Sequence, residues 1–269
     1  MRNIVRRLGW KIIRASGYQL SDIWDGWNLV LANAAEKDVH SLRRRLNDYM
    51  LLQQLSNLIV SRQIDLIIDV GAFKGSFTHK VRKAGFRGPI LSVEPNPERQ
   101  SELRSFGEGQ FNWFLSNKAA GVEVRTIQLQ VPRDSSFAST LNFSANARSI
   151  FGELTADITV YDVEQAPLSS MIEEFGLGGA KRILVKCDTQ GTDREVIRSL
   201  NNYINSVEVL LVEVPCINIY EKGGGLSNHN LYFESLGFGV AGIYPVSWTA
   251  EDAVVEFDIL YVRRQLEGS

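Results

Sequence analysis

The chain has 269 residues, of which 44% are apolar and 22% are charged, and its formal net charge at pH 7 is −2. This length allows one substantial hydrophobic core with an appendage, and the composition is that of a globular protein. The near balance of charges provides no general attraction to nucleic acid or to an acidic membrane, so no nucleic-acid partner is expected.

Cysteine content and hydropathy indicate the compartment. Cys187 and Cys216 are too few for a disulfide scaffold, which favours a reducing environment. No stretch approaches the roughly 18 consecutive apolar residues of a membrane span. The basic N-terminus has no uninterrupted apolar run of signal-peptide length, because Arg6, Lys11 and Arg14 interrupt it. We therefore expect a cytoplasmic protein without a membrane span.

Residues 1–60 are predicted to form a helical N-terminal extension, and residues 61–269 the main domain. In the segment 39–60, apolar residues recur at a helical spacing. In the segment 2–15, the apolar residues could share one helical face, which favours packing on the main domain or on a partner subunit. Weak peripheral contact of this helix with a membrane is the alternative.

Aromatic residues concentrate in the same extension, at Trp10, Tyr18, Trp24 and Trp27. Such side chains bury large areas and are suited to lining an acceptor pocket or a homodimer interface. Packing against the main domain is the simpler interpretation, and a homodimer is kept as the alternative.

From Ile64 onward, short apolar runs alternate with helical patterns. Strands are predicted at 64–70, 89–94, 112–115, 122–131, 182–188 and 207–213, and helices at 97–105 and 193–200. Continuous apolar runs such as IDLIIDV are typical of strands that are buried on both faces of a parallel sheet. The alternation predicts an α/β protein with a doubly wound, mostly parallel sheet.

The end of the chain departs from this alternation. The predicted strands 238–244 and 254–263 have no helix between them, so we expect an antiparallel hairpin that closes the sheet. The segment 132–156 is rich in Ser, Asn and Asp and is predicted to be a long loop over the sheet, of the kind that often carries function.

A turn with two glycines, DVGAFKG at residues 69–75, follows the first buried strand. Glycine at a strand end lets the backbone turn sharply and approach a ligand closely. The next helix is expected to begin near Ser76, where its free amide groups suit the carboxylate of a bound amino acid. The Gly-x-x-x-Gly spacing differs from the Gly-x-Gly-x-x-Gly of dinucleotide binders, which disfavours a nicotinamide-dependent dehydrogenase.

Glu94 ends the next predicted strand, within the sequence SVEPNP. At that place a carboxylate can accept hydrogen bonds from both ribose hydroxyls of an adenosine. A solvent-facing residue at a strand end is the alternative. The two prolines, which restrict the turn after the acid, favour the ribose interpretation.

Five segments, in the order in which they occur, resemble the motifs of class I methyltransferases and of the FkbM family in particular. They are IIDVGAFKGSFT, LSVEPNP, LSNKAAGVEV, SSFASTL and LVKCDTQGTDREVIRSL, and the resemblance runs from Ile64 to Arg264. It implies a Rossmann-like class I methyltransferase fold with a mostly parallel seven-stranded sheet. It also implies an enzyme that uses S-adenosylmethionine (SAM) to methylate a hydroxyl of a sugar, a glycan or a secondary metabolite.

The resemblance, taken position by position, implies a set of cofactor-binding residues. These are Asp69, Gly71, Ala72 and Gly75 for the methionine part, Glu94 for the ribose, Asn96, Ser116 and Asn117 near the adenine, and Asp188 beside the methyl group. Two positions depart from the family pattern. Asn117 stands where the family has an acid, and Asp193 replaces the first glutamate of a Gln-Gly-x-Glu signature.

Candidate catalytic residues come from the carboxyl ends of strands, where open α/β sheets bind ligands. Asp188 is the first candidate for a general base, and Lys186 is expected to pair with an acid nearby or to be solvated. Glu213 ends the next strand, and with Asp188 it could share the base role or bind a divalent cation such as Mg²⁺. Helix capping or a salt bridge is the alternative for each acid.

His229 is the second candidate base. It lies in a glycine-rich segment, 223–229, that is predicted to be a loop able to close over an acceptor. An ordinary surface histidine is the alternative.

Together these features predict a SAM-dependent O-methyltransferase that acts on a small-molecule or glycan acceptor. Two alternatives stay open. One is an N-methyltransferase of a small molecule, and the other is a binding protein that kept the fold and lost the chemistry.

Overall fold

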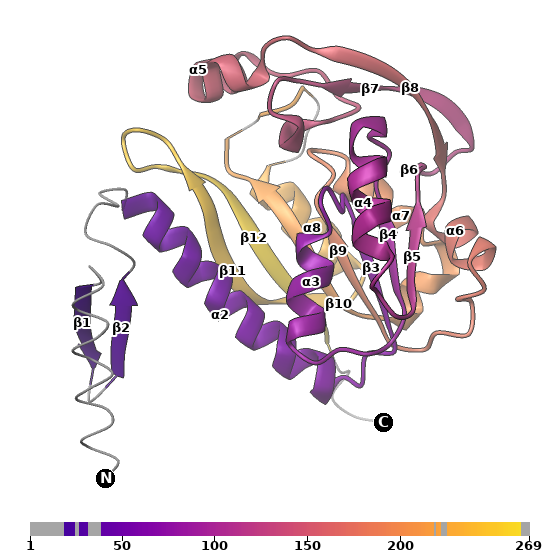
Figure 1. Cartoon of the computed structure of the whole chain (residues 1–269), viewed down its shortest axis with the longest axis horizontal. Coiled ribbons are helices and arrows are strands. Elements are labelled where there is room, and N and C mark those ends of the chain that lie inside the picture. The colour runs from indigo at the N-terminus through magenta and orange to yellow at the C-terminus, as the bar shows by residue number, and fades with distance from the viewer. Residues whose placement is uncertain (1–18, 25–26, 32–38, 218, 222–224, 265–269) are drawn as a thin grey trace. The chain divides into compact units, whose positions relative to one another are not determined.

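The computed structural model describes residues 19–24, 27–31, 39–217, 219–221 and 225–264 (Figure 1). The chain divides into two compact units, one up to Asn47 and one from Asp48 onward. Each unit is described by itself.

In the first unit, two strands form an antiparallel pair. They are β1 (Gln19–Trp24) and β2 (Trp27–Leu31), and Trp24 is the cross-strand partner of Trp27. The prediction that residues 1–60 are helical is therefore wrong for residues 19–24 and 27–31. Aromatic and branched residues such as these have a high preference for strands, and pairing with a second strand outweighs a helical preference. The predicted helix 2–15, Trp10 and Tyr18 lie outside the described residues.

The helix α2 (Val39–Ser61) confirms the predicted helical segment 39–60. Its buried apolar residues Leu51, Leu55 and Ile59 recur every fourth position and join one core of the main domain. The second compact unit thus begins at Asp48, within this helix, whereas the expected domain boundary lies at residue 61. The difference arises because the second half of α2 packs on the sheet.

A seven-stranded sheet forms the centre of the second unit. Its strands, in spatial order, are β11 (Phe238–Trp248), β12 (Val254–Arg263), β10 (Val207–Pro215), β9 (Ile183–Cys187), β3 (Leu66–Val70), β4 (Ile90–Val93) and β5 (Trp113–Ser116). All neighbours pair in parallel except β12, which is antiparallel to both β10 and β11. The predicted mostly parallel sheet and its closing hairpin are confirmed, and the last strand inserts between β10 and β11.

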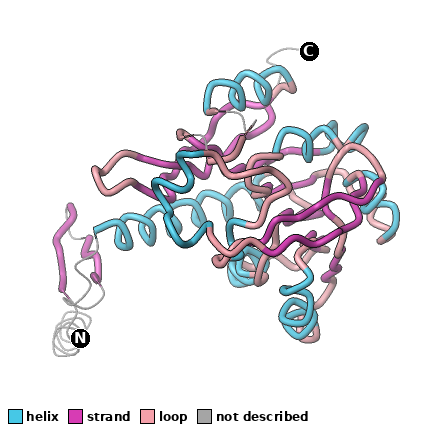
Figure 2. Tube along the Cα trace, turned by 90° about the horizontal axis from the view of Figure 1, so that it is seen from above, coloured by secondary structure: helices cyan, strands magenta, loops and turns pink. Residues whose placement is uncertain are grey.

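Helices cover both faces of this sheet (Figures 1 and 2). On one face, α2 and α3 (Ser76–Lys83) contact strand residues such as Ile67 and Leu184. On the other face, α6 (Leu168–Glu174), α7 (Asp193–Arg198) and α8 (Leu226–Ser235) contact residues such as Ile68 and Val185. Since successive strand residues point to opposite faces, burial on both sides explains the continuous apolar runs in the sequence.

Between β4 and β5 the chain forms a 3-10 helix, η1 (Pro97–Arg99), and α4 (Gln100–Gly107). Between β5 and β9 it forms a three-stranded sheet of β6 (Ala119–Ala120), β8 (Thr159–Ala166) and β7 (Arg125–Val131), in that spatial order. This part lies at the top of Figure 1. The segment predicted as a long loop, 132–156, contains the short helices η2 (Ser135–Phe137), α5 (Ala145–Phe151) and η3 (Gly152–Thr155).

The residues from Asn201 to Ser206 form a last 3-10 helix, η4, before β10. Within the part of the chain that the structure describes, no helix combines the length and the apolar character needed to cross a membrane.

Leu55 tests the packing of α2 on the sheet, because only 2% of its surface is exposed. We expect Leu55→Ala to lower the free energy of unfolding by about 2–5 kcal/mol, since it removes apolar contacts and leaves a cavity. Guanidinium unfolding measures this change. The matched control is Val60→Ala on the same helix, where 77% of the residue is exposed and a change within about 0.5 kcal/mol is expected. Equal losses in both variants would contradict the described packing.

Candidate active site

The glycine turn passes directly against the end of β9. Gly71 has a φ of 74°, and a Cβ atom there would lie 2.0 Å from the carbonyl oxygen of Asp188. Gly75 has a φ of 75°, and its Cβ would lie 2.8 Å from the ring of Phe106. No other residue fits either position without displacing its neighbours. The helix α3 begins at Ser76, as predicted, so its first amide groups follow the turn at once.

Glu94 holds the opposite side of the glycine turn. Its carboxylate accepts hydrogen bonds from the backbone N–H groups of Phe73, at 2.8 Å, and of Asn96, at 2.9 Å. Burial raises the pKa of Glu94, and these two hydrogen bonds oppose the rise. Only 7% of the residue is exposed, which disfavours the solvent-facing alternative. Each carboxylate oxygen keeps a second lone pair for a ligand.

The residues expected near the adenine gather around Glu94. Asn96 is buried, and its Oδ1 accepts a hydrogen bond from the N–H of Glu98. Its amide nitrogen has no hydrogen-bond partner among the described residues. Ser116 is buried at the end of β5, where its carbonyl accepts the N–H of Glu94, and Asn117 is exposed beside it. Asn96, whose backbone N–H donates to Glu94, therefore keeps an unused side-chain amide donor among the described residues.

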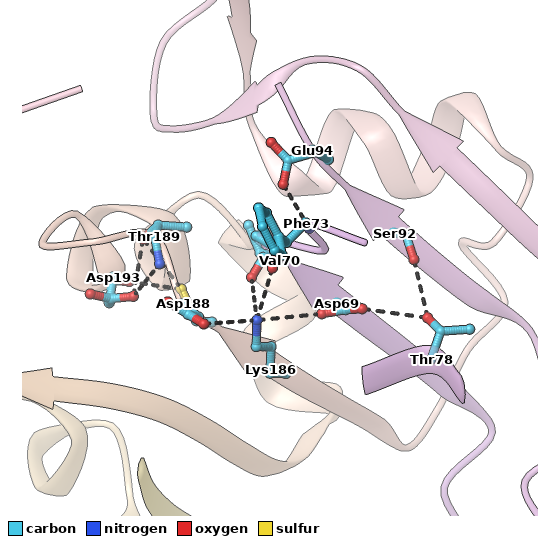
Figure 3. Close-up of polar contacts among 12 residues, drawn as sticks. Asp69, Val70, Phe73, Thr78, Ser92, Glu94, Lys186, Asp188, Thr189 and Asp193 are labelled. Atoms are coloured by element: carbon cyan, nitrogen blue, oxygen red, sulfur yellow. Dashed lines mark hydrogen bonds and ion pairs between the residues drawn. The ribbon is translucent and has the colours of Figure 1, made fainter. Parts of the chain in front are cut away.

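Lys186 links the glycine turn to two acids (Figure 3). Its ammonium donates a hydrogen bond of 2.9 Å to the carbonyl of Gly71 and lies 3.2 Å from Asp188 Oδ2 and 3.7 Å from Asp69 Oδ1. Burial opposes the charge of Lys186, but Asp188 and Asp69 outweigh this effect and raise its pKa. The expectation that Lys186 pairs with an acid near the site is confirmed.

Asp69 lies beneath the turn with no exposed surface. Burial raises its pKa to about 6, while Lys186 and a hydrogen bond from the Thr78 hydroxyl act in the opposite direction. Its carboxylate thus contacts Lys186, which donates a hydrogen bond to Gly71 of the turn, and Thr78 of the helix that follows the turn.

Asp188 follows β9, and 30% of its side chain is exposed. Its second oxygen, Oδ1, accepts a hydrogen bond of 3.0 Å from the amide nitrogen of Gln190. The same nitrogen donates to Glu213 Oε1 at 2.9 Å. Burial raises the pKa of Glu213, and Asp188 adds to the rise.

These contacts do not fit the predicted magnesium site. The two N–H bonds of the Gln190 amide point at the carboxylates of Asp188 and Glu213, where a shared cation would need only oxygen acceptors. Among the described residues, no group of three or more His, Cys, Asp or Glu side chains is arranged to hold a metal ion.

His229 lies on α8, and the prediction that it belongs to a loop is wrong. The helix forms because Gly225 ends the glycine-rich segment and the following residues pack against the sheet. Only 1% of His229 is exposed, and its Nδ1 lies 3.1 Å from the carbonyl of Gly225. Burial lowers its pKa. In this conformation an acceptor does not reach the imidazole.

Asp193 begins α7, as the sequence predicts, and it stabilises the turn that carries Asp188. Its Oδ1 accepts hydrogen bonds from the N–H and the hydroxyl of Thr189, at 3.1 and 3.0 Å. Asp193, which replaces the glutamate of the family signature, thus contacts the turn between β9 and α7 at Thr189.

Two groups at this site were not among the predicted site residues. The Gln-Gly pair directly after a buried strand was the signal that could have identified Gln190 as a site residue. Asp258 lies opposite Glu213 in the β10–β12 pair, and burial raises its pKa to about 7. An acid within the otherwise apolar run FDILYV was the available signal.

Several solved structures resemble this chain. Magnesium protoporphyrin IX methyltransferase from Synechocystis with bound SAM is 9% identical, with 95% of this chain and 89% of that chain covered and a TM-score of 0.44. Precorrin-6y C5,15-methyltransferase from Geobacter metallireducens is 13% identical, with 79% and 89% covered and a TM-score of 0.43. Fibrillarin from Aeropyrum pernix is 13% identical, with 74% and 66% covered and a TM-score of 0.41.

These likenesses are distant, so the assignment to a family rests on the family model. No curated protein sequence matches the chain significantly. The model of the methyltransferase FkbM domain matches residues 69–240, which include the glycine turn, Glu94 and the segment from Lys186 to Glu213. The match covers more than half of the chain, and the chain therefore belongs to the FkbM family of SAM-dependent methyltransferases, with a Rossmann-like class I fold.

Proposed function

We propose that the enzyme transfers the methyl group of SAM to a hydroxyl of a small-molecule or glycan acceptor, with Asp188 as the general base. The observation that carries this proposal is the position of Asp188. It is partly exposed at the end of β9, and its backbone contacts the glycine turn that would hold the cofactor.

The cofactor-binding residues form the first part of the proposal. The first amide groups of α3 and the turn at Gly71 and Gly75 would bind the methionine part of SAM. Glu94 would accept the ribose hydroxyls, because both of its oxygens keep a free lone pair. The unused amide donor of Asn96 supports a contact with the adenosine.

Methyl transfer to a hydroxyl requires a base that accepts the hydroxyl proton. When bound, SAM supplies an electrophilic methyl group on a sulfonium. The acceptor oxygen forms the new bond to carbon as the bond from carbon to sulfur breaks, and the hydroxyl proton must pass to a base. Asp188 suits this role because Lys186 and Gln190 hold its carboxylate from two sides. The buried imidazole of His229 does not have this access.

An amine acceptor is the second candidate. It is favoured by the acids around Asp188, since Glu213 and Asp258 face each other on the neighbouring strands. Carboxylates attract a cationic amine, and the same base could take the proton that leaves the nitrogen.

A cytoplasmic location is also part of the proposal, supported by two free cysteines, as expected in a reducing compartment.

Calorimetry with SAM and with NAD tests the cofactor, and transfer of a labelled methyl group to panels of glycosides and of amines tests the acceptor. We expect heat with SAM only, and label on the glycosides. Absence of heat with SAM would contradict both candidate functions, and label on amines alone would select the second.

Asp188→Asn tests the general base. We expect the rate of methyl transfer to fall by about 100-fold or more, because asparagine cannot take the proton, while SAM affinity changes by no more than about three-fold. The control is Asp162→Asn, which alters an exposed acid on β8 and should leave the rate as it is. If Asp188→Asn retains the full rate, Asp188 is not the base.

Gly71→Ala tests the glycine turn. The new Cβ would overlap the carbonyl of Asp188 at a positive φ, so the turn must move. We expect SAM to bind at least about ten-fold more weakly, or about 1.4 kcal/mol, in calorimetry. The control is Gly179→Ala, where no atom lies within 4 Å of the new Cβ. Equal affinities in Gly71→Ala and the wild type would contradict the described turn.

Lys186→Met tests the buried ion pairs. The substitution leaves Asp69 without its cation, and we expect the free energy of unfolding at pH 7 to fall by about 3–5 kcal/mol. Lys80→Met breaks a half-exposed pair with Asp48 and should cost only about 0–1 kcal/mol. Adding Asp69→Asn to Lys186→Met should restore part of the loss. A loss no larger than in Lys80→Met would refute the role of this cation.

A further inference from the structure

The turn between β9 and α7 has an unusual backbone. Gln190 has a φ of 55° and Gly191 a φ of 105°, so two successive residues adopt left-handed conformations. A residue with a side chain enters this region at a cost, and such residues cluster at functional sites. The turn is closely packed, because a Cβ at Gly191 would lie 3.0 Å from Leu141 and 3.3 Å from Tyr220.

This backbone directs the Gln190 side chain between the ends of two strands. Its amide nitrogen donates to Asp188 Oδ1 at 3.0 Å and to Glu213 Oε1 at 2.9 Å. Its amide oxygen accepts a hydrogen bond of 2.7 Å from the hydroxyl of Tyr220. The hydrogen bond from the Tyr220 hydroxyl occupies the amide oxygen, and the amide nitrogen faces Asp188 and Glu213.

The amide gives these acids a donor without adding a charge. Two carboxylates close together in a partly buried site repel each other, and Asp188 contributes to the raised pKa of Glu213. On Asp188, the ammonium of Lys186 lies next to Oδ2, while Oδ1 and Glu213 Oε1 accept hydrogen bonds from Gln190. Asp188 is therefore held through both oxygens, by a cation on one side and by a neutral amide on the other.

Gln190 also contacts segments distant in the sequence. Its backbone carbonyl accepts a hydrogen bond of 2.8 Å from the hydroxyl of Ser139, in the segment between η2 and α5. Tyr220, its other partner, belongs to a small hydrophobic cluster with Phe143 and Val255. The turn thereby joins two segments of the main domain to the strand ends that carry Asp188 and Glu213.

We propose that Gln190 is a positioning residue of the methyl-transfer site, whose amide fixes the orientation of the Asp188 and Glu213 carboxylates. The inference rests on the proposed function in taking Asp188 as the base. The contact of the amide with the two carboxylates does not depend on it.

Carbon-13 NMR of the side-chain carboxyls tests the contact directly. Titrations are recorded for the free protein and for the protein with S-adenosylhomocysteine, and the Glu213 signal is identified by its loss in Glu213→Gln. In Gln190→Met, which has a similar length and no donor, we expect the pKa of Glu213 to rise further, because the lost hydrogen bond favoured the charged form. Gln190→Glu preserves the shape, adds a negative charge and should raise it more.

The matched control is Tyr220→Phe, which removes the donor to the Gln190 oxygen and keeps both N–H donors to the carboxylates. Its Glu213 titration should coincide with that of the wild type. Coincident curves for the wild type, Gln190→Met and Gln190→Glu would overturn the proposal, and so would an equal shift in Tyr220→Phe.

The positioning role is tested on the acceptor that the methyl-transfer screen identifies. We expect kcat in Gln190→Met to fall by about 100-fold, with the affinity for S-adenosylhomocysteine unchanged, since a misplaced base costs rate rather than cofactor binding. An unchanged kcat would overturn the role. Failure of the wild-type protein to bind S-adenosylhomocysteine would contradict the proposed function instead, and the titration of the free protein would still decide the contact.

Discussion

The buried ammonium of Lys186 is the interaction on which the rest of the site depends. Burying a charged group away from water costs free energy unless hydrogen-bond acceptors surround it. Here two carboxylates and the carbonyl of Gly71 surround the ammonium of Lys186. Asp69 belongs to β3, Asp188 follows β9, and Gly71 begins the turn between β3 and α3. One cation therefore holds two neighbouring strands and the turn in a single arrangement. Removing it would leave the charge of Asp69 buried and without a cation, so the positions of the glycine turn and of the Asp188 carboxylate depend on each other.

The glycine turn is held from both sides. On the β9 side, the absence of a Cβ at Gly71 lets the turn lie against the carbonyl of Asp188. On the β4 side, Glu94 accepts the N–H of Phe73. A turn fixed in this way presents its amide groups before any ligand arrives, which reduces the entropy lost on binding. Glu94 thus has a structural contact, with the N–H of Phe73, in addition to its proposed contact with the ribose. The structural contact explains why Glu94 is buried.

The acids at the carboxyl ends of β9 and β10 illustrate how one side chain changes the interpretation of others. Asp188 and Glu213 on adjacent strand ends suggest a divalent cation when only the sequence is considered. The amide of Gln190 lies between them and donates to both, so a neutral group occupies the place of the predicted metal. The exposed part of Asp188 is then available to accept a proton, as its proposed role as the base requires.

Local patterns in the sequence were sufficient for the strands of the seven-stranded sheet, the turn at Gly71 and Gly75, and the acid at Glu94, because strand burial, left-handed turns and strand-end residues depend on near neighbours in the chain. They missed β8 and β6 of the three-stranded sheet. The same patterns failed for residues 19–24 and 27–31, where cross-strand pairing decides, and for His229, whose helix forms by packing against the sheet. Only the tertiary structure decided that β12 inserts between β10 and β11, and which groups each polar side chain contacts. Gln190 lies 23 residues from Glu213 and 30 from Tyr220, and hydrogen bonds over such separations have no local signature. The sequence by itself therefore determined the family, the cofactor and the glycine turn. The partners of Asp188 and Glu213 were decided by long-range packing, since the burial and charge around each carboxylate depend on strands and loops that meet only in the folded chain.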